Sequence, residues 1–157
     1  MQFIRVLIVA VAATLVLPAA AQDKPASNME ILQQKLKADK KLIVADNMEL
    51  TQTEAGKFWP IYDAYEKDLD KINQRLGKMI ATYADDYRNN TLSDDKAKAL
   101  IKEALAIEDA ELKLKRTYSE KLTPVLPQKK VARFLQIQNK IRAVVKYELA
   151  AQVPLVQ

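Results

Sequence analysis

The most regular pattern in the chain is a row of apolar residues between positions 58 and 83, in which the steps alternate between four and three residues. That spacing places the row on one face of a helix that packs against another helix. The row consists of Phe58, Tyr62, Tyr65, Leu69, Ile72, Leu76, Met79 and Tyr83. We therefore expect one long helix, with coiled-coil-like packing, from Thr51 to about Asn89.

Two residues near the start of this helix shape its beginning. Thr51 is followed three residues later by Glu54, which predicts a capping box. In that motif the hydroxyl and the carboxylate each accept a hydrogen bond from a free backbone N–H. Pro60 lies further inside and has no N–H to donate to the helix. It predicts a kink one or two turns from the start.

Two further helices flank the long one in the sequence. The first begins at Ser27, which forms a second capping box with Glu30, and ends near Asn47. The second begins after Ser93, an N-cap that is followed by two acidic residues at the positive end of the helix dipole. Pro124 breaks this second helix.

One position of the helix after Ser93 does not fit its apolar row. The row consists of Ala97, Leu100, Ala104, Ile107, Leu114, Tyr118 and Leu122. Glu111 stands where a further apolar residue is expected. We expect that the row drifts around the helix at this point. The other interpretation is a buried polar residue that sets the register of the packing.

The last helix has Pro127 in its first turn, where the missing N–H does no harm, and ends before Pro154. We expect its buried side to carry Val131, Phe134, Leu135, Ile141, Val145 and Leu149. The chain has only two glycines in 157 residues, which favours helices throughout. We predict an all-α fold of about four helices, an elongated hairpin or bundle over residues 27–157, after a flexible lead at residues 22–26.

The first 21 residues have the pattern of a secretory signal peptide. Arg5 supplies a positive charge, residues 6–17 are an unbroken run of apolar and small residues, and an A-x-A sequence ends at Ala21. An uncleaved membrane anchor is the alternative, but the run is too short for a stable span. No cysteine is present to carry a lipid anchor or a disulfide. We therefore expect cleavage after Ala21 and a mature protein that works outside the cytoplasm.

The residue types exclude most catalytic chemistry. The chain has no His and no Cys, which excludes Ser-His-Asp and Cys-His catalysis and the usual zinc and copper sites. No glycine-rich phosphate loop is present. The acidic pairs at 85–86 and 94–95 lack the ligand spacing and the glycine of a calcium loop. We expect no catalytic residue, no metal and no cofactor, and hence a non-enzymatic protein that binds a partner.

Positive charge is concentrated near the C-terminus of a chain whose net charge is +5. From residue 126 onward Glu148 alone opposes six cations, which are Lys129, Lys130, Arg133, Lys140, Arg142 and Lys146. This imbalance favours acidic proteins, anionic lipid or anionic polymer as partners, and a solvated helix face is the alternative. The candidate contacts to a client or partner are Lys129, Lys130 and Arg133. We expect the rings of Tyr62 and Tyr65 to lie in the core, and the alternative is that they line a concave surface and join these contacts.

Two short segments carry a family resemblance. Residues 50–54, Leu-Thr-Gln-Thr-Glu, resemble the LTxxQ motif of the Spy/CpxP-like periplasmic proteins, with Glu where Gln is usual. Residues 122–130, Leu-Thr-Pro-Val-Leu-Pro-Gln-Lys-Lys, resemble that family's second element, which also lies between the third and fourth helices, with two extra residues. The matching positions are Leu50, Thr51, Glu54, Leu122, Thr123 and Gln128.

This resemblance implies a small all-helical homodimer in the periplasm that binds unfolded or misassembled clients without ATP, or that restrains an envelope-stress sensor. Our leading hypothesis is accordingly an ATP-independent chaperone-like holdase or an envelope-stress adaptor. One alternative is a regulatory partner of a single envelope sensor domain. Another is a helical protein that binds anionic lipid or polymer at the membrane surface without being integral. We expect no nucleic-acid partner.

Overall fold

The computed structural model describes residues 39–156, and the chain in this range is helical except for short connections. A helical segment covers residues 39–48, followed by α2 (Gln52–Asn89), α3 (Asp94–Leu122) and α4 (Gln128–Gln152). The described range contains no strand, so the predicted all-α fold is confirmed. The expected cleavage site after Ala21, the lead at residues 22–26 and the helix start at Ser27 lie outside the described residues.

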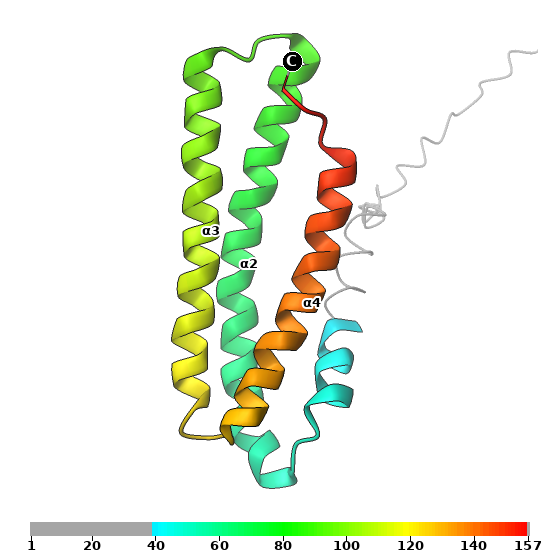
Figure 1. Ribbon diagram of the computed structural model, residues 1–157, viewed down its shortest axis with the longest axis vertical. Helices are drawn as coiled ribbons and strands as arrows, with labels where there is room; N and C mark the ends of the chain where they lie inside the picture. Colours follow the sequence, from blue (N-terminus) through cyan, green and yellow to red (C-terminus); the bar gives the residue numbers. More distant parts are fainter. Residues whose placement is uncertain (1–38, 157) are drawn as a thin grey trace, which may run out of the picture.

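The three labelled helices lie lengthwise beside one another and alternate in direction (Figure 1). α3 packs far more extensively on α2 than on α4. α4 moves away from α3 toward the end of the bundle where α2 finishes, which is the upper end in Figure 1. The segment 39–48 lies near the lower end, on the other side of α4 from α3. The upper half of the bundle therefore leaves more helix surface uncovered than the lower half.

α2 has the bounds that its pattern predicts. Thr51 is the N-cap, and the capping box is complete: the Thr51 N–H donates to Glu54 Oε2 (2.8 Å) and the Glu54 N–H donates to Thr51 Oγ1 (3.3 Å). Pro60 lies inside α2, which continues as a helix on both sides of it. A bend at Pro60 stays a prediction.

Aromatic residues dominate the centre of the core. Tyr65 packs against Phe134 of α4 and Tyr118 of α3, with ring centroids 5.3 and 5.4 Å apart and the rings nearly perpendicular. Edge-to-face pairs of this kind add stability beyond the area that they bury. Phe58 packs on Phe134 in the same way. The buried core consists of Val44, Met48, Phe58, Tyr62, Tyr65, Ile72, Ile107, Leu114, Tyr118, Leu122, Leu126, Val131, Phe134 and Ile137.

The structure corrects the expectation for Glu111. The apolar row of α3 does not drift, because Ile107, Leu114 and Tyr118 are all buried on the same face as Glu111. Glu111 itself is buried and forms an ion pair with Arg142 of α4. The second interpretation, a buried polar residue within the row, is therefore confirmed.

α4 begins after Pro127, which occupies the N-cap position, and its buried side differs from the expected one in two places. Val145 was expected in the core but is 38% exposed, because α4 has moved away from α3 at this level (Figure 1). Ile137 and Gln138, which the sequence pattern did not indicate, are buried. Within residues 39–156 no helix has the length and the hydropathy that crossing a membrane requires.

Candidate functional site

The two segments that resemble the family motifs meet at the lower end of the bundle. Lys130, in the first turn of α4, donates to Glu54 Oε2 (2.6 Å) in the capping box of α2. The same ammonium donates to the carbonyl oxygen of Glu49 (2.7 Å), and Arg133 pairs with the Glu49 carboxylate (2.9 Å). We call these four residues the junction. They tie the segment 39–48, α2 and α4 together.

The junction holds a strained residue and two perturbed carboxyl groups. Glu49 has a φ of 50°, which is uncommon for a residue other than glycine. The hydrogen bond from Arg133 lowers the pKa of Glu49. The hydrogen bond from Lys130 is the largest cause of a lowered pKa at Glu54, followed by the bond from the Thr51 N–H. Both pairs hold the backbone turn between residues 48 and 51 in place.

The other motif residues also have structural places. Leu122 is buried, Thr123 is the C-cap residue of α3, and Gln128 is the first residue of α4. Leu50 is half-buried and packs against the core. The six motif positions therefore fix helix ends and their contacts, and they do not form a recess for a ligand.

The structure places most of the expected basic contacts in intramolecular ion pairs. Lys130 and Arg133 bind the junction carboxylates, and Arg142 and Lys146 both approach Glu111. Lys129 is exposed and forms no ion pair with the described residues. The sequence could not indicate this because the acidic partners come from distant parts of the chain. The basic end of the chain is therefore largely neutralised within the fold.

Tyr62 and Tyr65 lie in the core, as expected, and not on a concave surface for a partner. Both side chains are buried, and burial is the main cause that raises the pKa of each phenol. They present no surface to a partner.

An exposed apolar row on α3 was missed at the sequence level. Ile101, Leu105 and Leu112 are 62%, 58% and 49% exposed. Their spacing of four and seven residues places them on one side of the helix. We call these three residues the outer apolar row. Each follows by one residue a position of the inward-facing α3 row, namely Leu100, Ala104 and Glu111. A search for a second heptad row could therefore have found them.

The outer apolar row lies on the flank of α3 that is turned toward α4. Glu108 stands between Leu105 and Leu112 along this flank, and its carboxylate is 3.7 Å from Lys146 Nζ of α4. Tyr147, the next residue of α4, is exposed. Large apolar side chains are therefore exposed on both helices at the level where α3 and α4 face each other.

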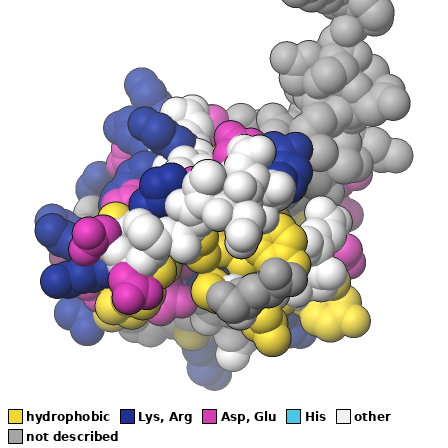
Figure 2. All heavy atoms as spheres, turned by 90° about the horizontal axis from the view of Figure 1, so that it is seen from above, with side chains coloured by type: hydrophobic (Ala, Val, Ile, Leu, Met, Phe, Trp, Pro, Cys, Tyr) yellow, Lys and Arg dark blue, Asp and Glu magenta, His cyan; other side chains and the backbone are white. Residues whose placement is uncertain are grey.

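The upper end of the bundle also shows apolar side chains among charged ones (Figure 2). Tyr83 Oη donates to the carbonyl oxygen of Pro154 (2.9 Å), which fastens the residues after α4 to the end of α2. Leu155 and Val156, which follow this contact, are exposed.

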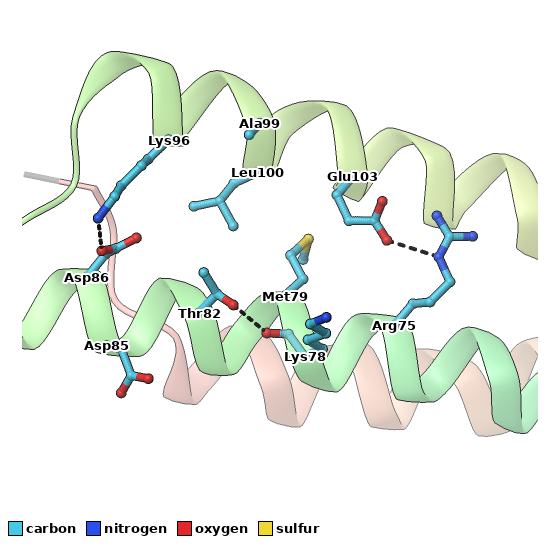
Figure 3. A pocket seen from close by; sticks show the side chains of 10 residues that line it. All are labelled: Arg75, Lys78, Met79, Thr82, Asp85, Asp86, Lys96, Ala99, Leu100 and Glu103. Carbon is cyan, nitrogen blue, oxygen red and sulfur yellow. Dashed lines mark hydrogen bonds and ion pairs between the residues drawn. The ribbon is translucent and has the colours of Figure 1, made fainter.

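A groove of about 670 Å³ lies between α2 and α3 in their upper halves. Figure 3 shows the side chains that line it, with Met79, Ala99 and Leu100 between two ion pairs. Arg75 Nε is 2.9 Å from Glu103 Oε1 toward the lower end, and Lys96 Nζ is 2.5 Å from Asp86 Oδ1 toward the upper end. The groove is open to solvent along one side.

Across residues 39–156, no three acidic side chains come together in the manner of a metal site. The chain matches no family model, no curated protein and no solved structure.

Proposed function

We propose that this protein is an exported, ATP-independent chaperone-like holdase or envelope-stress adaptor of the Spy/CpxP-like type. It binds partly unfolded protein segments through the outer apolar row. The proposed signal peptide, the absence of His and Cys from the chain and the two motif-like segments support the protein class. The exposed apolar row on α3 is the observation that supports the binding activity.

Apolar side chains that are exposed to water carry a free-energy cost, which is recovered when a partner covers them. Single exposed leucines are ordinary, but neighbouring large apolar side chains on one helix flank are typical of surfaces that bind another protein. Charged side chains border the row: Lys98 and Lys102 lie along α3 with Asp109. A surface of this kind holds apolar segments by burial, and mixed charges around it add weaker contacts that salt screens.

Two other partners fit the same surface. A single envelope sensor domain, bound in a regulatory role, would use the same apolar contacts with one saturable partner. A second copy of the chain would cover the row in the homodimer that the family resemblance implies. Anionic lipid or polymer receives less support, because four of the six cations near the C-terminus are held in ion pairs.

The test compares two variants of matched exposure in the chain from Gln22 onward. A denatured model client is diluted into buffer of low and high salt, and its aggregation is followed by light scattering. Ile101→Gln combined with Leu105→Gln removes most of the outer apolar row. Leu42→Gln is the control, because Leu42 is as exposed as Ile101, at 62%, but lies on the segment 39–48.

We expect the unaltered protein and the Leu42→Gln variant to suppress aggregation at near-stoichiometric ratios. The double variant should lose most of this activity while keeping its helical circular dichroism. Absence of suppression by the unaltered, folded protein would overturn the chaperone proposal, and a pull-down from periplasmic extract would then test the sensor-partner alternative. Equal suppression by all three proteins would show that clients bind elsewhere.

A further inference from the structure

The groove between α2 and α3 is separate from the outer apolar row. α4 passes behind α2 in the view of Figure 3, on the side away from the groove. The groove therefore opens on a different face of the bundle from the flank where α3 faces α4. Its volume of about 670 Å³ lies within the range of small-molecule sites.

The charges around the groove are unevenly matched. Asp86 is paired with Lys96 and also accepts from Thr91 Oγ1 (2.8 Å). Asp85 is paired with Arg88, which does not line the groove. The acidic groups at the upper end are thus all neutralised by neighbouring cations or hydrogen bonds.

The lower end carries an excess of positive charge. Arg75 and Lys78 lie one turn apart on α2, and Glu103 is the carboxylate that faces them. Glu103 binds Arg75 through the Nε atom. The Lys78 ammonium forms no hydrogen bond or ion pair with any residue from 39 to 156, whereas the Lys78 carbonyl accepts from Thr82 Oγ1 (3.0 Å). The pKa of Glu103 is lowered chiefly by the hydrogen bond from Arg75, with a further contribution from the charge of Lys78. Two cations therefore share one carboxylate at this end.

The floor between the two ends is apolar. Met79 and Leu100 are half-buried and face the groove from opposite helices, and Ala99 leaves space beside them (Figure 3). Lys78 and Asp86 are eight residues apart on α2, which corresponds to roughly 12 Å along the helix axis. A flexible aliphatic chain of medium length fits this span.

We propose that the groove binds a monomeric anionic amphiphile, with its carboxylate at Lys78 and Arg75 and its aliphatic chain along Met79, Ala99 and Leu100. The reverse orientation is less favourable, because Asp85 and Asp86 at the upper end are matched by Arg88 and Lys96 and leave no excess positive charge for the anionic head group. Removal of the ligand's aliphatic chain from water supplies most of the affinity. The exposed cations orient the ligand and supply a smaller share of the affinity. This site does not depend on client binding.

The experiment uses methyl-¹³C-methionine NMR of the chain from Gln22 onward, titrated with decanoate below its micellar concentration. Met79 lines the groove, whereas Met48 is fully buried in the core away from it and serves as an internal control. Decanol has the aliphatic chain of decanoate but no negative charge, and so tests the need for the charge. Butyrate has the charge but a short aliphatic chain, and so tests the need for length. Vesicles of an anionic phospholipid distinguish a lipid surface from a free amphiphile.

We expect decanoate to shift the Met79 signal in a saturable way and to leave Met48 in place, with weaker shifts from decanol and butyrate. Lys78→Gln should raise the dissociation constant about fivefold, the usual worth of one exposed charge contact. Lys98→Gln, the same change on α3 outside the groove, should not. Ala99→Glu places a bulky negative group in the groove at an exposed position and should abolish binding.

Three results would overturn the proposal. They are the absence of a Met79 shift with decanoate, equal binding of decanol with no effect of Lys78→Gln, and binding to vesicles without binding of free decanoate.

Discussion

Glu111 of α3 and Arg142 of α4 form an ion pair inside the bundle, where Glu111 is buried and 13% of the Arg142 side chain is exposed. Arg142 also donates to Asn73 Oδ1 of α2 (3.0 Å), so that one guanidinium connects three helices. Lys146 approaches the other carboxylate oxygen of Glu111 at 3.6 Å. Burial lowers the pKa of Arg142. This contact fixes the lengthwise register of α4 against α3, two helices that otherwise touch little.

Removal of Arg142 alone should destabilise the fold strongly. Arg142→Met leaves the Glu111 carboxylate buried with Lys146 as its remaining cation, and the loss of one partner of a buried pair costs about 3 kcal/mol or more. Glu111→Leu combined with Arg142→Met should recover most of this loss, because apolar replacements of a buried pair are often neutral. Urea unfolding followed by circular dichroism measures both. A double variant as unstable as Arg142→Met would show that the pair contributes through its hydrogen bond to Asn73.

Substitution of Lys130 should destabilise the fold much more than substitution of its neighbour Lys129. Lys130→Met removes the hydrogen bonds to Glu54 and Glu49, and bonds to charged groups are worth about 2 kcal/mol. Lys129 is exposed, so Lys129→Met should change the free energy of unfolding by less than about 0.5 kcal/mol. Thermal melts of the two variants make the comparison. Similar melting temperatures would contradict the role assigned to the junction.

Acid should weaken the junction. A carboxyl group whose pKa is lower in the folded protein than the ordinary 4.5 stabilises the fold above that value. This contribution disappears as the pH falls through the lowered folded pKa. The melting temperature should therefore drop between about pH 5 and pH 3. Glu54→Gln retains a capping side chain but cannot pair with Lys130, so its melting temperature at neutral pH should be lower and its drop in acid smaller.

The control for this experiment is Asp109→Asn, which removes an exposed carboxylate outside the junction. It should retain the full drop of the unaltered protein. An equal acid response in Glu54→Gln would mean that other carboxylates account for it.

The Tyr118 hydroxyl should ionise at a higher pH than an ordinary tyrosine. Its hydroxyl donates to Asp68 Oδ2 (2.7 Å), and burial first, then this hydrogen bond, raise the pKa of Tyr118 to about 12. This phenol ionises more readily in the unfolded chain than in the fold. The fold therefore loses stability as the pH rises above 10, the ordinary pKa of tyrosine. Tyr118→Phe should lose about 1 kcal/mol at neutral pH and show a smaller loss of stability in alkali. Unfolding at neutral and alkaline pH, with tyrosinate absorbance as the second readout, tests both effects.

The helices could be predicted from local patterns, because caps and apolar rows depend on neighbours in sequence. Thr51 with Glu54, Ser93, and the row through Tyr65 all lie where they were expected. Partners that come from distant helices could not be predicted in this way. Glu54 and Lys130 are separated by 76 residues, and neither pattern indicates the other.

The candidate surface was missed for a different reason. Ile101, Leu105 and Leu112 each lie one position after a residue of the inward-facing α3 row, so a single wide apolar stripe and a core row with an exposed flank have the same sequence pattern. Only the position of α4, which leaves this flank uncovered, distinguishes them.

The junction also sets an order of assembly. α2 and α3 are joined by a short turn and can pair as soon as both have been synthesised, since their contacts are local. The segment 39–48 is made earlier, but its final turn is held by an ammonium group 81 residues further along the chain. The turn at Glu49 therefore lacks its ammonium contact until the start of α4 has been made, although Lys40 and Lys41 can already pair with Glu66 and Asp63 of α2.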